Sequence, residues 1–192
     1  VLADIVNVQV LPDNLPAPVD DGGADHLLGM TLPHVTLAAT NGASVDVGAL
    51  GGISVLYFYP RTGRPDEPLP DGWDMVPGAR GCTPQSCAFR DHFAELQGLG
   101  AQHVYGVSTQ STDYQSEAAA RLHLPFALLS DEDRKLADAL RLPMMEVAGM
   151  VLNRRLTLIV ENGRIVRTFY PVFPPDRNAG DVLEALRLRE WA

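Results

Sequence analysis

Three runs of apolar residues in the middle of the chain predict strands of a buried sheet. Residues 53–59, which read ISVLYFY, form the longest run and have the length of a buried strand. Residues 103–107 and 125–129 are further runs of this kind. The longest run ends at Pro60, and residues 61–81 then hold four prolines and several glycines. We therefore expect a long irregular insertion after the first of these strands.

Two pairs of short alternating runs each enclose an Asn-Gly dipeptide. Asn-Gly between alternating runs is a strong signal for the tight turn of a β-hairpin, so each pair predicts a hairpin. The first hairpin comprises residues 34–38 and 44–47, and the second comprises residues 155–160 and 165–170.

Apolar residues at helical spacing predict four helices. In the first, Phe89, Phe93 and Leu96 mark one face. Pro84 suits its first turn, and Thr83 is a candidate cap. The remaining helices are expected from a capping box at 112–115 to about 123, after a cap at Asp131, and from about residue 179.

The alternation of strands and helices predicts an α/β protein with a mixed central sheet and helices on both faces. Residues 1–24 are rich in proline, aspartate and glycine, and we expect them to be an N-terminal extension. Residues 25–192 form the predicted domain. The chain of 192 residues with 46% apolar content is long enough for one full core.

Charge and composition exclude several classes of function. A net charge of −9 and a pI near 4.9 argue against nucleic acid or an anionic membrane as partner. No apolar run approaches the roughly 18 residues of a membrane span, and no basic secretory leader is visible. Two cysteines are too few for a disulfide framework, so we expect a reducing, cytoplasmic location.

The two cysteines, Cys82 and Cys87, lie where the insertion gives way to the first predicted helix. The partial positive charge of a helix N-terminus favours the reactive thiolate, and a second thiol nearby can capture an oxidised first one. Five residues along a helix advance about 7.5 Å, whereas a disulfide needs α-carbons within about 7 Å and facing side chains. A Cys82–Cys87 disulfide therefore requires the first turn to unwind.

A metal site is the alternative for Cys82, Cys87 and His92. Their spacing matches none of the usual zinc patterns and lacks an evident fourth ligand, so we expect neither a metal nor a cofactor. Cys87 could instead be a helix residue that faces the core.

Three segments together resemble the peroxiredoxins, the alkyl hydroperoxide reductase and thiol-specific antioxidant superfamily. They are Phe58-Tyr59-Pro60, residues 81–91 (GCTPQSCAFRD) and residues 155–160 (RLTLIV). The two cysteines five residues apart resemble the Q-type, or bacterioferritin-comigratory, branch. The resemblance implies a thioredoxin-like fold and reduction of hydrogen peroxide and organic hydroperoxides.

The resemblance also implies residue roles. Cys82 matches the peroxidatic cysteine, Cys87 the resolving cysteine, and Arg155 an arginine that approaches the peroxidatic sulfur. Pro60 matches the proline that opens the active-site loop, and Gly81 would help to bind the peroxide through backbone N–H groups.

One position departs from the family pattern, which has a hydroxyl residue three positions before the peroxidatic cysteine. Here that position is Ala79. Thr62 could fold back to supply the hydroxyl, and a plain loop role is its alternative. Likewise, Arg155 could pair with Glu161, and Arg80 could be a solvated loop charge.

The implied partners are a peroxide and thioredoxin or a similar dithiol reductant, acting on a monomer or homodimer. Two rival functions remain at this point. One is a thiol–disulfide oxidoreductase of the same fold, although the chain lacks Cys-x-x-Cys. The other is a redox sensor without enzymatic activity.

Overall fold

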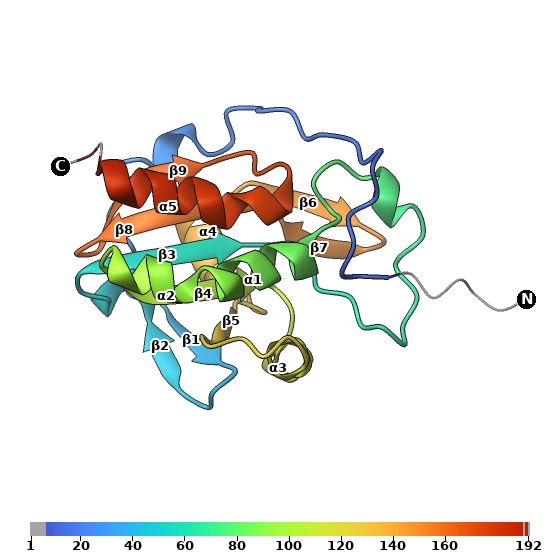
Figure 1. Ribbon diagram of the computed structural model, residues 1–192, viewed down its shortest axis with the longest axis horizontal. Helices are drawn as coiled ribbons and strands as arrows, with labels where there is room; N and C mark the ends of the chain where they lie inside the picture. The colour runs from blue at the N-terminus through green and yellow to red at the C-terminus, as the bar shows by residue number, and fades with distance from the viewer. Residues whose placement is uncertain (1–6, 190, 192) are drawn as a thin grey trace, which may run out of the picture.

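A mixed seven-stranded sheet forms the centre of the molecule (Figure 1). The computed structural model describes residues 7–189 and 191. The strand order is β2-β1-β5-β4-β3-β8-β9, in which β3, β4 and β5 run parallel and the remaining pairs are antiparallel. The strands are β1 (Thr36–Ala39), β2 (Ser44–Asp46), β3 (Ile53–Phe58), β4 (Ala101–Ser108), β5 (Leu128–Ser130), β8 (Leu156–Glu161) and β9 (Arg164–Phe169).

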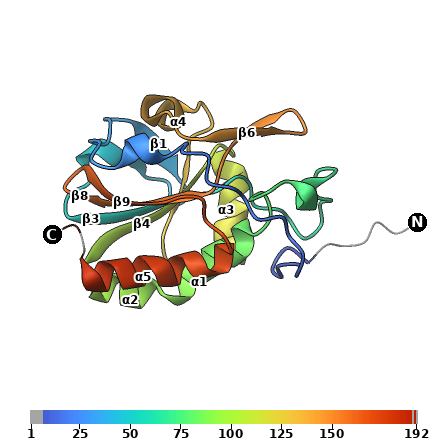
Figure 2. The same cartoon turned by 90° about the horizontal axis from the view of Figure 1, so that it is seen from above.

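Helices cover both faces of this sheet, as the sequence predicts (Figure 2). Helices α1, α2, α3 and α5 contribute to the hydrophobic core on one face, and α4 with the short helix η1 (Asp25–Leu27) contributes to the core on the other. The helices are α1 (Cys82–Asp91), α2 (Phe93–Gly98), α3 (Thr112–Arg121), α4 (Lys135–Leu140) and α5 (Asn178–Leu188). No helix among the described residues is long and apolar enough to cross a membrane.

Strand β3 belongs to both cores because every one of its residues is buried. Val55 and Tyr57 face the core under α1 and α5, whereas Leu56 and Phe58 face the opposite core. A strand that is covered on both faces reads as a continuous apolar run, which explains the pattern of residues 53–59.

Both predicted Asn-Gly hairpins are confirmed as β1–β2 and β8–β9. A third hairpin, β6 (Met144–Val147) with β7 (Met150–Asn153), escaped prediction. Its turn is Ala148-Gly149, and both residues have positive φ, 50° and 76°. Alanine rarely adopts that conformation, so the turn lacks the Asn-Gly or Asp-Gly dipeptide that signals a tight hairpin turn.

Two predicted helix caps were wrong. Gly81, with φ of 106°, precedes α1, and Thr83 makes no cap hydrogen bond. Helix α3 is capped by Ser111, whose hydroxyl accepts from the Tyr114 amide, and not by Thr112. Asp131 lies before the cap position of α4, yet its carboxylate accepts hydrogen bonds from two amides of the helix.

Residues 61–81 form a small lobe against hairpin β6–β7 at one end of the molecule (Figures 1 and 2). Trp73, at the start of the short helix η3 (Trp73–Met75), is 3% exposed. It packs in a separate hydrophobic cluster with Ala79, Val147 and Leu152. This lobe positions the backbone that leads into α1.

Candidate active site around Cys82

Cys82 is the first residue of α1 and is 3% exposed. Its Sγ lies 3.7 Å from the carbonyl oxygen of Ala79, to which the thiol donates. The first amides of a helix have no partner within the helix, so the thiol lies beside backbone N–H groups that are free to bind an anion.

Gly81 fits this position because no side chain can. Its φ of 106° lies in the left-handed region that other residues rarely adopt. A Cβ on Gly81 would lie 2.6 Å from Cγ of Pro175 and 2.9 Å from Cδ2 of Leu11. The chain thus passes between the N-terminal segment and the short helix η4 (Pro175–Arg177) just before the thiol.

Arg155 brings a positive charge to the same sulfur. Its Nη2 lies 3.3 Å from Cys82 Sγ, although the two residues are 73 positions apart. The same nitrogen donates to the carbonyl oxygens of Gly78, Ala79 and Arg80 at 3.1–3.2 Å. Arg155 is 3% exposed and makes these contacts in place of the ion pair with Glu161 that was its alternative.

A buried amide holds the guanidinium of Arg155 from its other end. Arg155 Nη1 donates to Gln85 Oε1 at 2.5 Å, and Gln85 Nε2 donates to Asn178 Oδ1 at 2.9 Å. Asn178 Oδ1 also accepts from the hydroxyl of Thr157 at 2.6 Å. Sequence reasoning missed these three residues. The one available signal was the position of Gln85, one helical turn after Cys82.

Two tyrosines of the β3 segment lie beneath the thiol. Tyr57 stacks on Phe89 of α1 at 4.4 Å between ring centroids, and its hydroxyl donates to Ser86 Oγ at 3.0 Å. Burial raises the pKa of Tyr57 and that of Tyr59 well above the ordinary value. Both phenols therefore stay neutral around pH 7 and add no negative charge beside the sulfur.

Cys87 lies further along α1 and is partly buried, and both cysteines are free thiols. Burial raises the pKa of the Cys87 thiol, and the nearby charge of Arg90 partly offsets this effect. Because both cysteines belong to one continuous helix, this geometry separates them as the helical spacing predicts.

Thr62 is fully buried, but its contacts are with Gln110 and not with Cys82. Its backbone amide and its hydroxyl both donate to Gln110 Oε1, at 2.9 and 3.2 Å. Pro60 is also buried, and its carbonyl oxygen accepts from the Ser108 hydroxyl at 3.3 Å. The structure thus brings Cys82, Gly81 and Arg155 together and ties Thr62 to a different polar cluster.

Arg80 differs from the solvated charge that the sequence suggested. Its side chain is 6% exposed, and its Nη1 lies 3.0 Å from Asp74 Oδ1. Its Nη2 donates to the carbonyl oxygen of Asn7 at 3.0 Å. Arg80 therefore links the lobe to the N-terminal segment directly beside the active-site loop.

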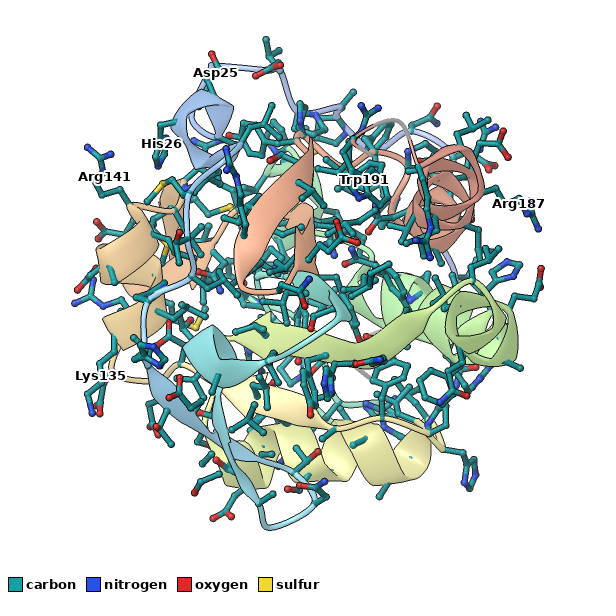
Figure 3. All side chains as sticks on the ribbon, turned by 90° about the vertical axis from the view of Figure 1, so that its left-hand side faces the viewer. Asp25, His26, Lys135, Arg141, Arg187 and Trp191 are labelled. Carbon is teal, nitrogen blue, oxygen red and sulfur yellow. The ribbon has the colours of Figure 1, made fainter. Side chains whose placement is uncertain are left out.

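A groove of about 770 Å³ lies elsewhere, along β9. Asp25 and Trp191, both labelled in Figure 3, line it, and Trp191 lies between β9 and α5. None of the residues that the sequence predicts for the active site lines this groove.

Comparisons with known proteins give a consistent picture. The Redoxin family model matches residues 27–184. "Peroxiredoxin Q, chloroplastic" of Sedum lineare is 31% identical over 160 residues, which cover 83% of this chain and 77% of that protein. The protein of the same name from Oryza sativa subsp. japonica is 30% identical, and the match spans 66% of its length.

Solved structures support the fold. Peroxidoxin BcpB from Mycobacterium tuberculosis superposes with a TM-score of 0.66 at 24% identity, over 84% of this chain and 96% of that chain. A cysteine-to-serine mutant of PrxQ from Xylella fastidiosa gives 0.68 at 23% identity, with the same coverage of both chains. These likenesses confirm the thioredoxin-like fold class predicted from the sequence.

Proposed function

This chain belongs to the Redoxin family and, within it, to the peroxiredoxins, and on that premise we propose that it is a thiol-dependent peroxidase whose peroxide-reducing residue is Cys82. The contact that carries this proposal is the 3.3 Å distance from Arg155 Nη2 to Cys82 Sγ. A buried guanidinium at this distance stabilises a thiolate, and the thiolate is the nucleophile in thiol chemistry.

In the first step, the Cys82 thiolate attacks one oxygen of a hydroperoxide ROOH. A sulfur–oxygen bond forms as the O–O bond breaks, so the sulfur is oxidised to sulfenic acid and the peroxide is reduced. The RO⁻ group leaves and takes up a proton to become an alcohol, or water when R is hydrogen. Charge grows on the leaving oxygen in the transition state, and donors already in place there lower the barrier.

The surrounding residues supply those donors. Arg155 presents guanidinium N–H groups beside the sulfur, and the first amides of α1 point out of the helix at Gly81 and Cys82. Gln85 Oε1 accepts a hydrogen bond from Arg155 Nη1 and so holds the guanidinium in place, which makes Gln85 a positioning residue in this proposal. Asn178 holds Gln85 in turn.

In the second step, the Cys87 thiolate attacks the sulfur of the Cys82 sulfenic acid, and a sulfur–sulfur bond forms as the sulfur–oxygen bond breaks. Hydroxide leaves and takes up a proton to become water. The α1 helix must unwind locally, because residues five apart on an intact helix cannot reach disulfide geometry. An external dithiol of the thioredoxin type would then reduce the disulfide by exchange. We also propose a cytoplasmic location, where such dithiols keep thiols reduced.

The proposal predicts fast and complete oxidation of both thiols by one equivalent of hydrogen peroxide. Free thiols should be counted after rapid quenching, and the product mapped by mass spectrometry. We expect loss of both thiols orders of magnitude faster than for free cysteine, and a Cys82–Cys87 intrachain disulfide. A rate like that of free cysteine, together with reduction of protein disulfides, would favour the disulfide oxidoreductase instead.

The resolving step should depend on pH through Cys87. Burial holds the pKa of Cys87 above its ordinary value, so at pH 7 a smaller thiolate fraction is present than in an exposed cysteine. Below the pKa that fraction grows about tenfold per pH unit, and the rate of sulfenic acid loss should grow with it. Stopped-flow trapping of the sulfenic acid between about pH 6 and 8 measures this slope. A flat profile would show that helix unwinding limits the step.

A further inference from the structure

The N-terminal segment, residues 7–18, crosses the outside of the thiol site. Both views place it beside the start of α1 (Figures 1 and 2). The carbonyl oxygen of Asn7 accepts from Arg80, and Val8 is 8% exposed against Gly63. Further along, Pro18 lies against Gly78. The segment is thus fastened at several points to the loop that leads into Cys82.

Leu11 of this segment lies against Gly81, the residue before Cys82. Its Cδ2 would be 2.9 Å from a Cβ on Gly81, and Pro175 closes the same position from the other side. The Cys82 sulfur itself contacts Arg155 and the carbonyl oxygen of Ala79, and it lies at the start of α1. Cys82 is 3% exposed.

We propose that Leu11 is a specificity-determining residue that limits the size of the hydroperoxide reaching Cys82. The proposal rests on the proposed function, because it concerns access to the peroxide-reducing thiol. Leu11 and Pro175 form an apolar wall next to Gly81, and a group R attached to the peroxide must fit against this wall or displace it. Hydrogen peroxide carries no such group, so its rate depends far less on the wall.

The ratio of two rate constants tests this idea. Oxidation of Cys82 is measured with hydrogen peroxide and with cumene hydroperoxide in the full chain, in Leu11→Ala and in Leu11→Trp. We expect the rate constant with cumene hydroperoxide, divided by that with hydrogen peroxide, to rise about fivefold or more in Leu11→Ala and to fall in Leu11→Trp. Val10→Ala is the matched control, because Val10 is on the same segment and is 57% exposed. Its ratio should not change.

An unchanged ratio in both Leu11 variants would overturn the proposal. An equal decrease of the rate constant with both peroxides in Leu11→Ala would also overturn the proposal. Leu11 would then support the geometry of the thiol without selecting peroxides by size. Circular dichroism shows whether each variant is folded.

Alkylation of Cys82 separates this proposal from the proposed function. Iodoacetamide and a bulky aromatic maleimide are compared in the same variants, with the labelled peptide identified by mass spectrometry. If no form of the chain reacts rapidly with peroxide, the proposed function fails. The size limit itself would still show as faster labelling by the bulky reagent in Leu11→Ala, and its absence there would count against Leu11.

Discussion

Replacing Cys82 with serine should abolish peroxide reduction, whereas replacing Cys87 with serine should leave one rapid turnover. Serine at position 82 offers a hydroxyl in place of a thiolate, and no other described residue beside Arg155 Nη2 is a thiol. Cys87 cannot take over, because burial raises the pKa of its thiol and Arg155 contacts Cys82 at the start of the helix. In Cys87→Ser, the sulfenic acid at Cys82 should form at the normal rate and then persist.

Stopped-flow peroxide consumption, combined with chemical trapping of sulfenic acid, measures both outcomes. The expected signature is no consumption in Cys82→Ser and one equivalent per chain in Cys87→Ser. Consumption that continues in Cys82→Ser would remove Cys82 from the mechanism. Repeated turnover in Cys87→Ser with a dithiol present would show that the reductant attacks the sulfenic acid directly.

Replacing Arg155 with lysine should slow the reaction of Cys82 with hydrogen peroxide by about a hundredfold or more. Lysine keeps the charge but not the planar fork, so it cannot contact the sulfur, three carbonyl oxygens and Gln85 together. The loss should appear in the second-order rate constant for sulfenic acid formation. The later rate of disulfide formation should change less, because Cys87 makes no contact with Arg155.

Two measurements keep a structural effect apart from a catalytic one. Thermal unfolding reports how much stability the buried contacts of Arg155 contribute. Arg164→Lys serves as the matched control, because Arg164 is an exposed arginine of β9 and lines the groove that contains none of the active-site residues. A rate constant for Arg155→Lys equal to that of the unchanged chain would remove Arg155 from the transition state.

Local sequence patterns correctly predicted the central strand and two of the hairpins. The run at residues 53–59 and the two Asn-Gly turns specify strands through burial and turn geometry that act within a few residues. The hairpin β6–β7 was missed because Ala148 adopts a positive φ that its own side chain disfavours. Tertiary packing, which a single sequence does not display, holds that turn in place.

The active site also depends on contacts between residues far apart in the sequence, which local patterns do not reveal. Cys82 was predicted from its position at a helix start as well as from the family resemblance, and Arg155 from the resemblance alone. The structure places Arg155 Nη2 3.3 Å from Cys82 Sγ. Asn178 and Leu11 act through contacts between elements far apart in the chain, so no local pattern marks them. The only local signal for Gln85 is its position one helical turn after Cys82. Thr62 is the sequence's candidate for the missing hydroxyl, but that hydroxyl donates to Gln110 Oε1. Ala79 packs in an apolar cluster, which suits the side chain that replaces the family's hydroxyl there.

The burial of Trp73 gives the protein a built-in optical reporter. Its indole is 3% exposed and packs with Ala79, whose carbonyl accepts from the Cys82 thiol. The chain has one other tryptophan, Trp191, which lines the groove along β9. Unwinding of α1 on oxidation would disturb the loop that packs with Trp73. The redox state of the cysteines should therefore be readable from intrinsic emission, without any label.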